Sequence, residues 1–235
     1  MSRLWHHSAV CLLITGKKGS GKSTLWLKLI QEFQRKGYRI FVFDHKLEVS
    51  HKLGWKAQVT IEQMKATALA GKPVVFYPGI MYPANRRAAF DDFCRWVFEV
   101  SSVLPGKKIL AIDEVQQWTE LGRDGVPESF QLILDDGRLR GLDLLLISQT
   151  PNKVNDAIRA QVTEVYCFKH TDKLVLKWLE EDPFCLDAAE VSSLQKPGGW
   201  VYRNCDTDEM KRSGANASDT TRKAGTRPNV AGRKA

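Results

Sequence analysis

The sequence predicts an α/β fold in which a mostly parallel central sheet is covered by helices on both faces. Short, mostly apolar runs alternate with amphipathic helical stretches over most of the chain, a pattern typical of strands buried between two helical layers. The chain has 235 residues and 43% hydrophobic content, which is enough to bury one sizeable core. Neither an internal repeat nor a linker interrupts it before residue 205. We therefore expect one domain, residues 1–205.

Each expected strand is a short run of aliphatic and aromatic residues. The second run closes on Asp44 and the fourth on Asp113, so each places a carboxylate at the end of a strand. The region after Thr171 is less regular, and its one apolar run is expected at the sheet edge. The expected strands are Val10–Ile14, Arg39–Phe43, Pro73–Tyr77, Lys108–Ile112, Leu142–Ile147, Val162–Phe168 and Trp200–Arg203.

The helices are expected where apolar residues recur with helical spacing. In the first helix Trp26, Leu29, Ile30 and Phe33 fall at positions i, i+3, i+4 and i+7, so one face of this helix is apolar. The expected helices are Lys22–Lys36, Asn85–Val100, Glu128–Leu134, Val154–Ala160 and Leu174–Leu179.

A glycine-rich loop between the first strand and the first helix fits the phosphate-binding pattern G-x-x-x-x-G-K-[ST] at every position. In this pattern glycines let the backbone pass close to phosphate, successive N–H groups point inward, and the helix adds its positive end. Lys22 would reach the β- and γ-phosphates, and the Ser23 hydroxyl would be a ligand of Mg²⁺. The predicted nucleotide-binding residues are Gly16, Lys17, Lys18, Gly19, Ser20, Gly21, Lys22, Ser23 and Thr24.

The strand Lys108–Ile112 ends in two adjacent carboxylates, Asp113 and Glu114. Asp113 would lie beside the phosphate loop and hold Mg²⁺ through water. A second carboxylate can orient and deprotonate an attacking water, so Glu114 favours hydrolysis over transfer to a bound alcohol. The alternative interpretation is that the pair only starts a surface loop.

The strand Leu142–Ile147 contributes candidates at both of its ends. Gln149 follows it and would contact the γ-phosphate or the lytic water, unless it is only a turn residue before Pro151. Arg138 and Arg140 precede it in a Gly-Arg-rich turn. An arginine that reaches across a subunit boundary can stabilise the charge on the γ-phosphate. The sequence does not decide which of the two arginines has this role. The alternative interpretation is that both lie in a solvated loop.

These motifs resemble the FtsK–HerA branch of P-loop ATPases over residues 10–151, above all in the Gly-Arg-rich turn followed by a strand ending Ser-Gln-Thr-Pro. The resemblance implies a RecA-like sheet, ATP and Mg²⁺ as cofactors, and an ATP-hydrolysing motor that moves double-stranded DNA. It implies a ring, usually a hexamer, with Arg138 or Arg140 as a finger in trans. Among family members the chain looks most like genome-packaging ATPases of icosahedral viruses with an internal membrane, which implies capsid or vertex proteins as partners.

Two features depart from the family pattern. The second strand of the family often ends in an Asp-Pro-Lys-Gly-like turn, whereas this chain has Asp44-His45-Lys46-Leu47. A role for Asp44 and Lys46 at the nucleotide therefore stays open. No pore loop for DNA is evident, and Trp118 and the segment Arg123–Val126 are candidates by position only.

Three other functions remain open. A nucleoside or nucleotide kinase would use Asp44 as a base and Arg138 and Arg140 as lid arginines. An assembly ATPase of filamentous phage, of the zonula-occludens-toxin type, resembles the same loop and acts at the membrane. A structural component would bind ATP without useful hydrolysis.

The formal charge of +8 lies mostly at the end of the chain. Residues 210–235 hold seven basic residues and one acid, which leaves about +2 to residues 1–209. We expect residues 206–235 to form a disordered basic tail that binds DNA phosphates or docks on a capsid or membrane surface.

The chain has no apolar run of transmembrane length. It has five cysteines, and no two of them form a C-x-x-C pair. These features predict a reducing compartment rather than secretion, and the family resemblance implies that this compartment is the host cytoplasm or the packaging vertex of the virion.

Overall fold

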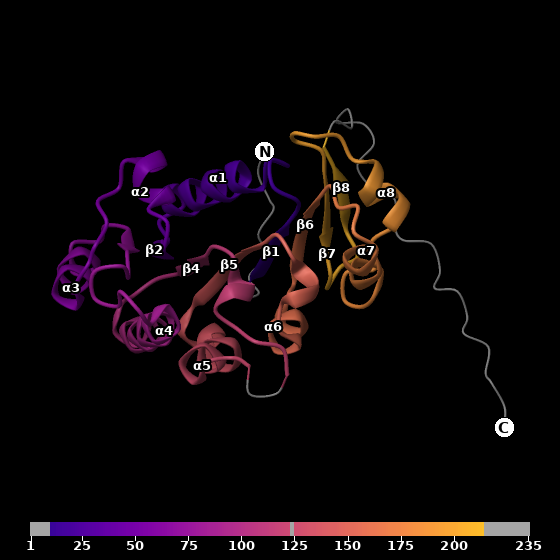
Figure 1. The fold of residues 1–235 in the computed structure, drawn as a ribbon. Coiled ribbons are helices and arrows are strands. Elements are labelled where there is room, and N and C mark those ends of the chain that lie inside the picture. Colours follow the sequence, from indigo (N-terminus) through magenta and orange to yellow (C-terminus); the bar gives the residue numbers. More distant parts are fainter. Residues whose placement is uncertain (1–9, 123–124, 214–235) are drawn as a thin grey trace, which may run out of the picture.

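The computed structural model describes residues 10–122 and 125–213, and these build one sheet of eight strands in the order β3-β2-β4-β5-β1-β6-β7-β8 (Figure 1). All neighbouring strands from β3 to β6 run parallel, and the last two pairs are antiparallel. The strands are β1 (Cys11–Thr15), β2 (Arg39–Phe43), β3 (Val74–Phe76), β4 (Lys108–Ile112), β5 (Leu142–Ser148), β6 (Glu164–Phe168), β7 (Trp200–Asn204) and β8 (Met210–Arg212).

Helices cover both faces of the sheet, as predicted. Figure 1 shows α1 and α2 on one side and α4, α5 and α6 on the other. The α-helices are α1 (Lys22–Arg35), α2 (Glu48–Leu53), α3 (Ile61–Leu69), α4 (Arg86–Val103), α5 (Glu128–Asp136), α6 (Asp156–Gln161), α7 (Lys173–Glu180) and α8 (Ala188–Ser193). Short 3-10 helices are η1 (Val115–Gln117), η2 (Gly137–Arg140) and η3 (Pro151–Lys153). No helix within the described ranges is long and apolar enough to cross a bilayer.

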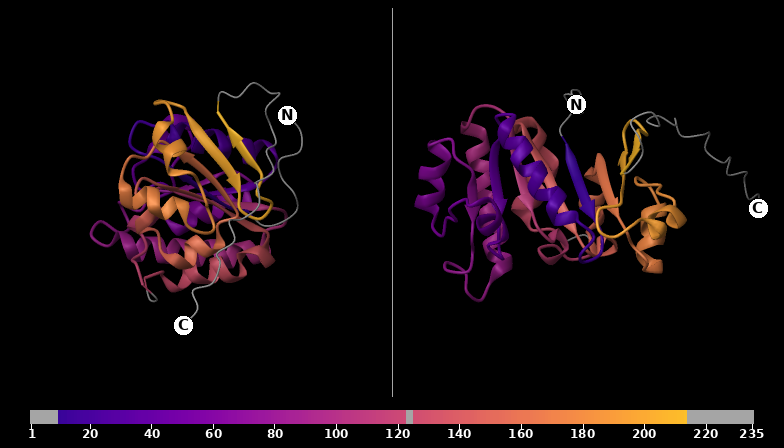
Figure 2. Two further views of the ribbon diagram at one scale, coloured as in Figure 1. Left: turned by 90° about the vertical axis from the view of Figure 1, so that its right-hand side faces the viewer. Right: turned by 90° about the horizontal axis from the view of Figure 1, so that it is seen from above.

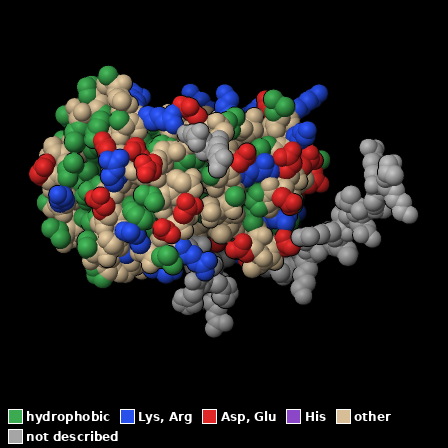
Figure 3. All heavy atoms as spheres, turned by 90° about the horizontal axis from the view of Figure 1, so that it is seen from below, with side chains coloured by type: hydrophobic (Ala, Val, Ile, Leu, Met, Phe, Trp, Pro, Cys, Tyr) green, Lys and Arg blue, Asp and Glu red, His purple; other side chains and the backbone are tan. Residues whose placement is uncertain are grey.

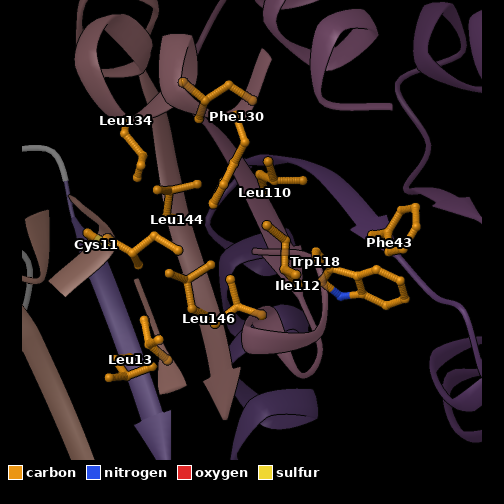
Figure 4. Close-up of a cluster of buried hydrophobic side chains, with 14 of the residues drawn as sticks. Cys11, Leu13, Phe43, Leu110, Ile112, Trp118, Phe130, Leu134, Leu144 and Leu146 are labelled. Carbon is orange, nitrogen blue, oxygen red and sulfur yellow. The ribbon is translucent and has the colours of Figure 1, made fainter. Parts of the chain in front are cut away.

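The strands divide their side chains between two apolar clusters, because successive residues of a strand point to opposite faces. Leu12 and Ile14 of β1 pack with α1, whereas Leu13 packs in the cluster under α4 and α5. In Figure 4 Leu110 and Leu144, from neighbouring strands, lie together in this second cluster. Full burial of one such side chain contributes roughly 1.5–3 kcal/mol. The two clusters hold the parallel strands, and therefore their ends, in fixed register.

The C-terminal end of the sheet differs from the expectation. Trp200–Arg203 was expected at the edge, but β7 pairs with β6 on one side and with β8 on the other. The domain boundary predicted after residue 205 therefore falls inside the β7–β8 hairpin, at the right of Figure 1 and nearest the viewer in the left view of Figure 2. The edge strand Met210–Arg212 is half-exposed and polar, so it carries no apolar alternation by which it could be recognised. Residues 214–235 of the predicted tail lie outside the described residues.

Candidate nucleotide site

The parallel strands bring most of the predicted site residues together at the carboxyl ends of the strands. β1 lies between β5 and β6, and β4 lies on the other side of β5. Thr15 of β1 is in register with Ser148 of β5, and Ile112 of β4 with Leu146 of β5. The phosphate loop, the acid pair and Gln149, which follow these three strands, therefore meet at their carboxyl ends, the usual place for a ligand in an open α/β sheet.

The phosphate loop has the tight backbone that its glycines predict. Gly19 and Gly21 have φ of 73° and 105°, conformations that side chains disfavour. A Cβ on Gly16 would lie 2.6 Å from both the Cβ of Phe168 and the Oγ of Ser20. The Ser20 Oγ is buried and has no hydrogen-bond partner among the described residues. The loop is tightly packed, and the Ser20 hydroxyl is free to donate a hydrogen bond. Both features suit a ligand rich in hydrogen-bond acceptors.

The loop opens onto a cavity of about 260 Å³ at the start of α1. Its lining includes Gly19, Lys22, Ser23 and Thr24 from the predicted motif, with Pro197 from the opposite side. No side chain caps the helix, so its first N–H groups lack the partners that an anion would supply. The first turn of α1 can therefore bind phosphate.

Lys22 is buried to 5% exposure within this first turn. Burial lowers the pKa of its ammonium, and the carboxylates of Glu114 and Asp113 oppose this shift. Lys22 thus lies within electrostatic reach of both acids, as the motif predicts. The Ser23 hydroxyl and the Asp113 carboxylate supply hard oxygen ligands, which fit Mg²⁺. We found no cluster of three or more His, Cys, Asp or Glu side chains suited to a metal within residues 10–122 and 125–213.

Glu114 is held in place by its neighbours. It is 2% exposed and adopts a left-handed backbone conformation, with φ of 51°. The backbone N–H of Gln149 donates to Glu114 Oε2 at 3.2 Å, and the Gln149 side-chain amide donates to Oε1. Gln116 Nε2 donates to Oε2 at 2.6 Å. The structure thus places the predicted base and the predicted sensor in direct contact, and it adds Gln116, which the sequence pattern did not single out.

Asp113 forms an ion pair with Lys46, whose Nζ lies 3.1 Å from Oδ2. Burial raises the pKa of Asp113, and Lys46 opposes this shift. Lys46 therefore belongs to the site although its turn lacks the family pattern. Asp44 has a different role, because its carboxylate accepts the backbone N–H groups of Glu48 and Ser50 at 2.8 and 3.1 Å and so caps α2.

Lys17 and Lys18 tie the loop to the segments that follow β6 and α8. Lys17 donates from its backbone to the Lys169 carbonyl at 3.3 Å and from Nζ to the Thr171 hydroxyl. The Lys18 carbonyl accepts from Lys196 Nζ at 2.8 Å. These contacts hold the loop in position, and they engage the side chain of Lys17 but only the backbone of Lys18.

The two candidate arginines lie at the other end of β5, away from the phosphate loop of the same chain. Arg140 donates to the Phe98 carbonyl at 2.9 Å, and its guanidinium lies 3.5 Å from the centre of the Phe98 ring. Arg138 is exposed. Neither arginine can reach the phosphate loop of its own chain from this end of the strand, so only a neighbouring chain could bring one to it.

The predicted DNA-contacting positions are not supported where the structure describes them. Trp118 is 3% exposed, donates from Nε1 to the Asp113 carbonyl at 2.9 Å and packs edge-on against Phe43. It is therefore buried beneath the site and cannot contact DNA. Gly125 is buried, and its carbonyl accepts from Arg87. Arg123 and the residue after it lie outside the described residues.

A family model described as zonular occludens toxin (Zot) matches residues 10–194. The chain belongs to the Zot family. The match includes the phosphate loop, the acid pair and Gln149, and it ends before the β7–β8 hairpin. The family, which the sequence offered as one alternative, is a P-loop ATPase family. No curated protein matches the chain.

Solved structures share the fold of this Zot-family chain. The genome-packaging NTPase B204 of Sulfolobus turreted icosahedral virus 2, in complex with AMP, superposes with a TM-score of 0.72 at 19% identity, over 88% of this chain and 98% of B204. The bacterial conjugative coupling protein TrwB gives 0.65 at 12% identity, over 89% of each chain. These structures confirm the predicted RecA-like fold, and the Zot family match confirms the predicted resemblance to P-loop ATPases.

Proposed function

We propose that this protein is an ATP-hydrolysing motor that moves double-stranded DNA into a preformed viral capsid. The observation that carries the proposal is the contact between Glu114 and Gln149 beside the phosphate loop. A kinase needs neither residue, whereas a motor that activates water needs a held carboxylate near the γ-phosphate. The likeness in fold to a viral genome-packaging NTPase that was solved with AMPPCP and with ATP-gammaS supports the same function.

The residues of the site divide the work of this reaction between them. The loop Gly16–Ser23 binds the phosphates, and Lys22 lies against the β- and γ-phosphates. Ser23 and Asp113 would hold Mg²⁺, which would supply positive charge to offset the negative charge that develops on the phosphates. Glu114 accepts a proton from the attacking water, and Gln149 holds the Glu114 carboxylate and reports the state of the γ-phosphate to β5.

A ring completes the site in this proposal. Because Arg138 and Arg140 lie at the far end of β5, a neighbouring subunit must supply the finger that stabilises the γ-phosphate charge. Arg138 is the better candidate because it is exposed, whereas Arg140 is engaged by Phe98. We propose a homo-oligomeric ring, a hexamer by family resemblance, that works in the host cytoplasm or at the vertex of the virion with capsid or vertex proteins.

Among the described residues, the face that α4 and α5 cover shows no large basic patch in Figure 3. There the described acidic and basic side chains are interspersed (Figure 3). In our proposal the basic residues after Ser213 are candidates for binding DNA or a membrane, through release of counterions from phosphate groups.

The Zot family match favours a second function, assembly of filamentous phage at a membrane. ATP turnover measured with double-stranded DNA, with anionic phospholipid vesicles and with nucleosides separates the candidates. Packaging predicts stimulation by DNA in the absence of vesicles. Stimulation by vesicles alone would favour phage assembly, and stimulation by a nucleoside alone would favour a kinase; either result would contradict the packaging motor.

A further inference from the structure

A second cavity, of about 280 Å³, adjoins the phosphate cavity. Gly21, Thr24 and Pro197 line both cavities, so the two are continuous around the start of α1. The lining of the second cavity is otherwise mostly apolar and includes Leu25, Phe168 and Trp200. A group attached to phosphates bound at the loop would enter this cavity without leaving the surface of the protein.

The aromatic walls of the cavity are fixed in position. Trp200 is half-buried and packs edge-on against Tyr166, with ring centres 5.2 Å apart. Its backbone N–H donates to Ser213 Oγ at 2.7 Å, and its carbonyl accepts from the Ser213 N–H at 2.9 Å. Phe168 is 2% exposed, and its ring would lie 3.4 Å from a Cβ on Gly21. Rigid aromatic faces of this kind offer stacking surface at low entropic cost.

The turn before β7 is joined to the phosphate loop. Gly198 donates from its backbone to the Ser20 carbonyl at 2.9 Å, and Lys196 Nζ donates to the Lys18 carbonyl at 2.8 Å. The cavity wall and the phosphate loop are therefore one unit. Part of this wall, including Pro197 and Trp200, lies beyond the residues 10–194 that the Zot family model matches.

We propose that this second cavity binds the base of a purine nucleoside triphosphate, which stacks on Trp200. The proposal rests on the proposed function, because the phosphates of the same nucleotide must occupy the loop. The cavity is lined by no carboxylate or carboxamide side chain among the described residues, and Lys28 is its only charged lining group. Such walls recognise the face of a base rather than its hydrogen-bonding edge, so adenine and guanine bind alike.

The test is calorimetric binding of three probes to the full chain: ATP, GTP and inorganic tripolyphosphate, which has no base. Trp200→Ala removes the stacking face, and Trp200→Phe keeps an aromatic ring. Trp55→Ala is the matched control, because Trp55 is also half-buried but lies near the edge strand β3, at the other end of the sheet.

We expect Trp200→Ala to weaken binding of ATP and GTP by roughly 10- to 100-fold and to leave tripolyphosphate binding unchanged. Trp200→Phe retains most of the affinity, and Trp55→Ala retains all of it. Equal loss of tripolyphosphate binding in Trp200→Ala, unchanged ATP binding, or a preference above about tenfold between ATP and GTP would overturn the proposal. If the wild-type protein binds tripolyphosphate as tightly as ATP, the base site is overturned and the proposed function is not. If the wild-type protein binds neither probe, the proposed function is overturned as well.

Discussion

Gln149 binds both oxygens of the Glu114 carboxylate, through its backbone N–H to Oε2 and through its side-chain amide to Oε1. The pair links the ends of two neighbouring strands, β4 and β5. Glu114 is buried and has a left-handed backbone, which costs of order 1–3 kcal/mol in a non-glycine residue. Backbone strain of this kind persists where neighbouring residues hold the strained conformation. Here the hydrogen bonds from Gln149 and Gln116 hold the Glu114 carboxylate in place.

The first prediction concerns Gln149. Gln149→Ala removes a hydrogen bond to a charged group, so the Glu114 carboxylate is no longer held toward the attacking water. We expect kcat for ATP hydrolysis to fall roughly 10- to 100-fold, with little change in the Kd for ATP. Gln131→Ala is the control, because the Gln131 side-chain amide donates to Asp135 on the surface of α5 at 2.9 Å, away from the site. An unchanged kcat in Gln149→Ala would remove Gln149 from the mechanism.

The second prediction separates the two arginines. Arg138→Ala should lower ATP turnover of the assembled ring by about 10³-fold or more, without changing the Tm of the subunit. Arg140→Ala should lower the free energy of unfolding by about 1–2 kcal/mol, because its guanidinium packs on the Phe98 ring.

Mixed rings test whether the arginine acts between subunits. Arg138→Ala subunits and Glu114→Gln subunits, each inactive alone, should regain part of the turnover when mixed. Absence of any recovery, with mixed rings demonstrated by mass, would contradict a finger supplied in trans.

The third prediction concerns the pH dependence of stability. Glu164 of β6 is 5% exposed, and burial raises its pKa to about 7. Because the folded chain holds this proton more tightly than the unfolded chain, stability falls as pH rises from about 4.5 to 7. Glu164→Gln removes this loss, so its free energy of urea unfolding should exceed that of the wild type by about 1–3 kcal/mol at pH 8 and match it at pH 4.

The control for Glu164 is Glu180→Gln, which changes an exposed acid at the end of α7. Its unfolding free energy should follow the wild type at both pH values. If the Glu164→Gln protein shows the same pH dependence as the wild type, the Glu164 carboxyl is not protonated in the folded state near neutral pH.

The fourth prediction concerns the end of the chain. A protein that ends at Ser213 loses five basic residues and one acid but keeps β8. It should retain basal ATP turnover, bind DNA more weakly and show a shallower dependence of affinity on salt. A protein that ends at Glu209 also loses β8, which pairs with the strand that carries Trp200, so its affinity for ATP should fall as well. Equal basal turnover and ATP affinity in both would contradict a role for the hairpin.

The sequence predicted the parallel strands and the long helices because their periodicity is strong. Arg39–Phe43 and Lys108–Ile112 are observed with the predicted limits. The helices α2, α3 and α8 were missed. α2 and α8 have six residues each and bury a single apolar side chain, Val49 or Val191, and the nine residues of α3 bury only Met64 and Ala68. β8 was missed because an edge strand needs no apolar face.

The candidate site was predictable where chemistry fixes the spacing along one strand or loop. The phosphate loop and Asp113 are such cases. Lys46 could be found only from the position of its strand, because β2 pairs with β4 and brings the turn after Phe43 beside Asp113. Trp200 lies far along the chain from the phosphate loop, and no local pattern links the two.

The most direct measurement of the central claim is ATP binding and ATP turnover by Glu114→Gln, each with and without double-stranded DNA. Glutamine keeps the shape of Glu114 and one of its two acceptor oxygens, but it cannot accept the proton of water. We predict wild-type affinity for ATP and a loss of DNA-stimulated turnover of roughly 10²- to 10⁴-fold. Turnover equal to that of the wild type would contradict Glu114 as the base.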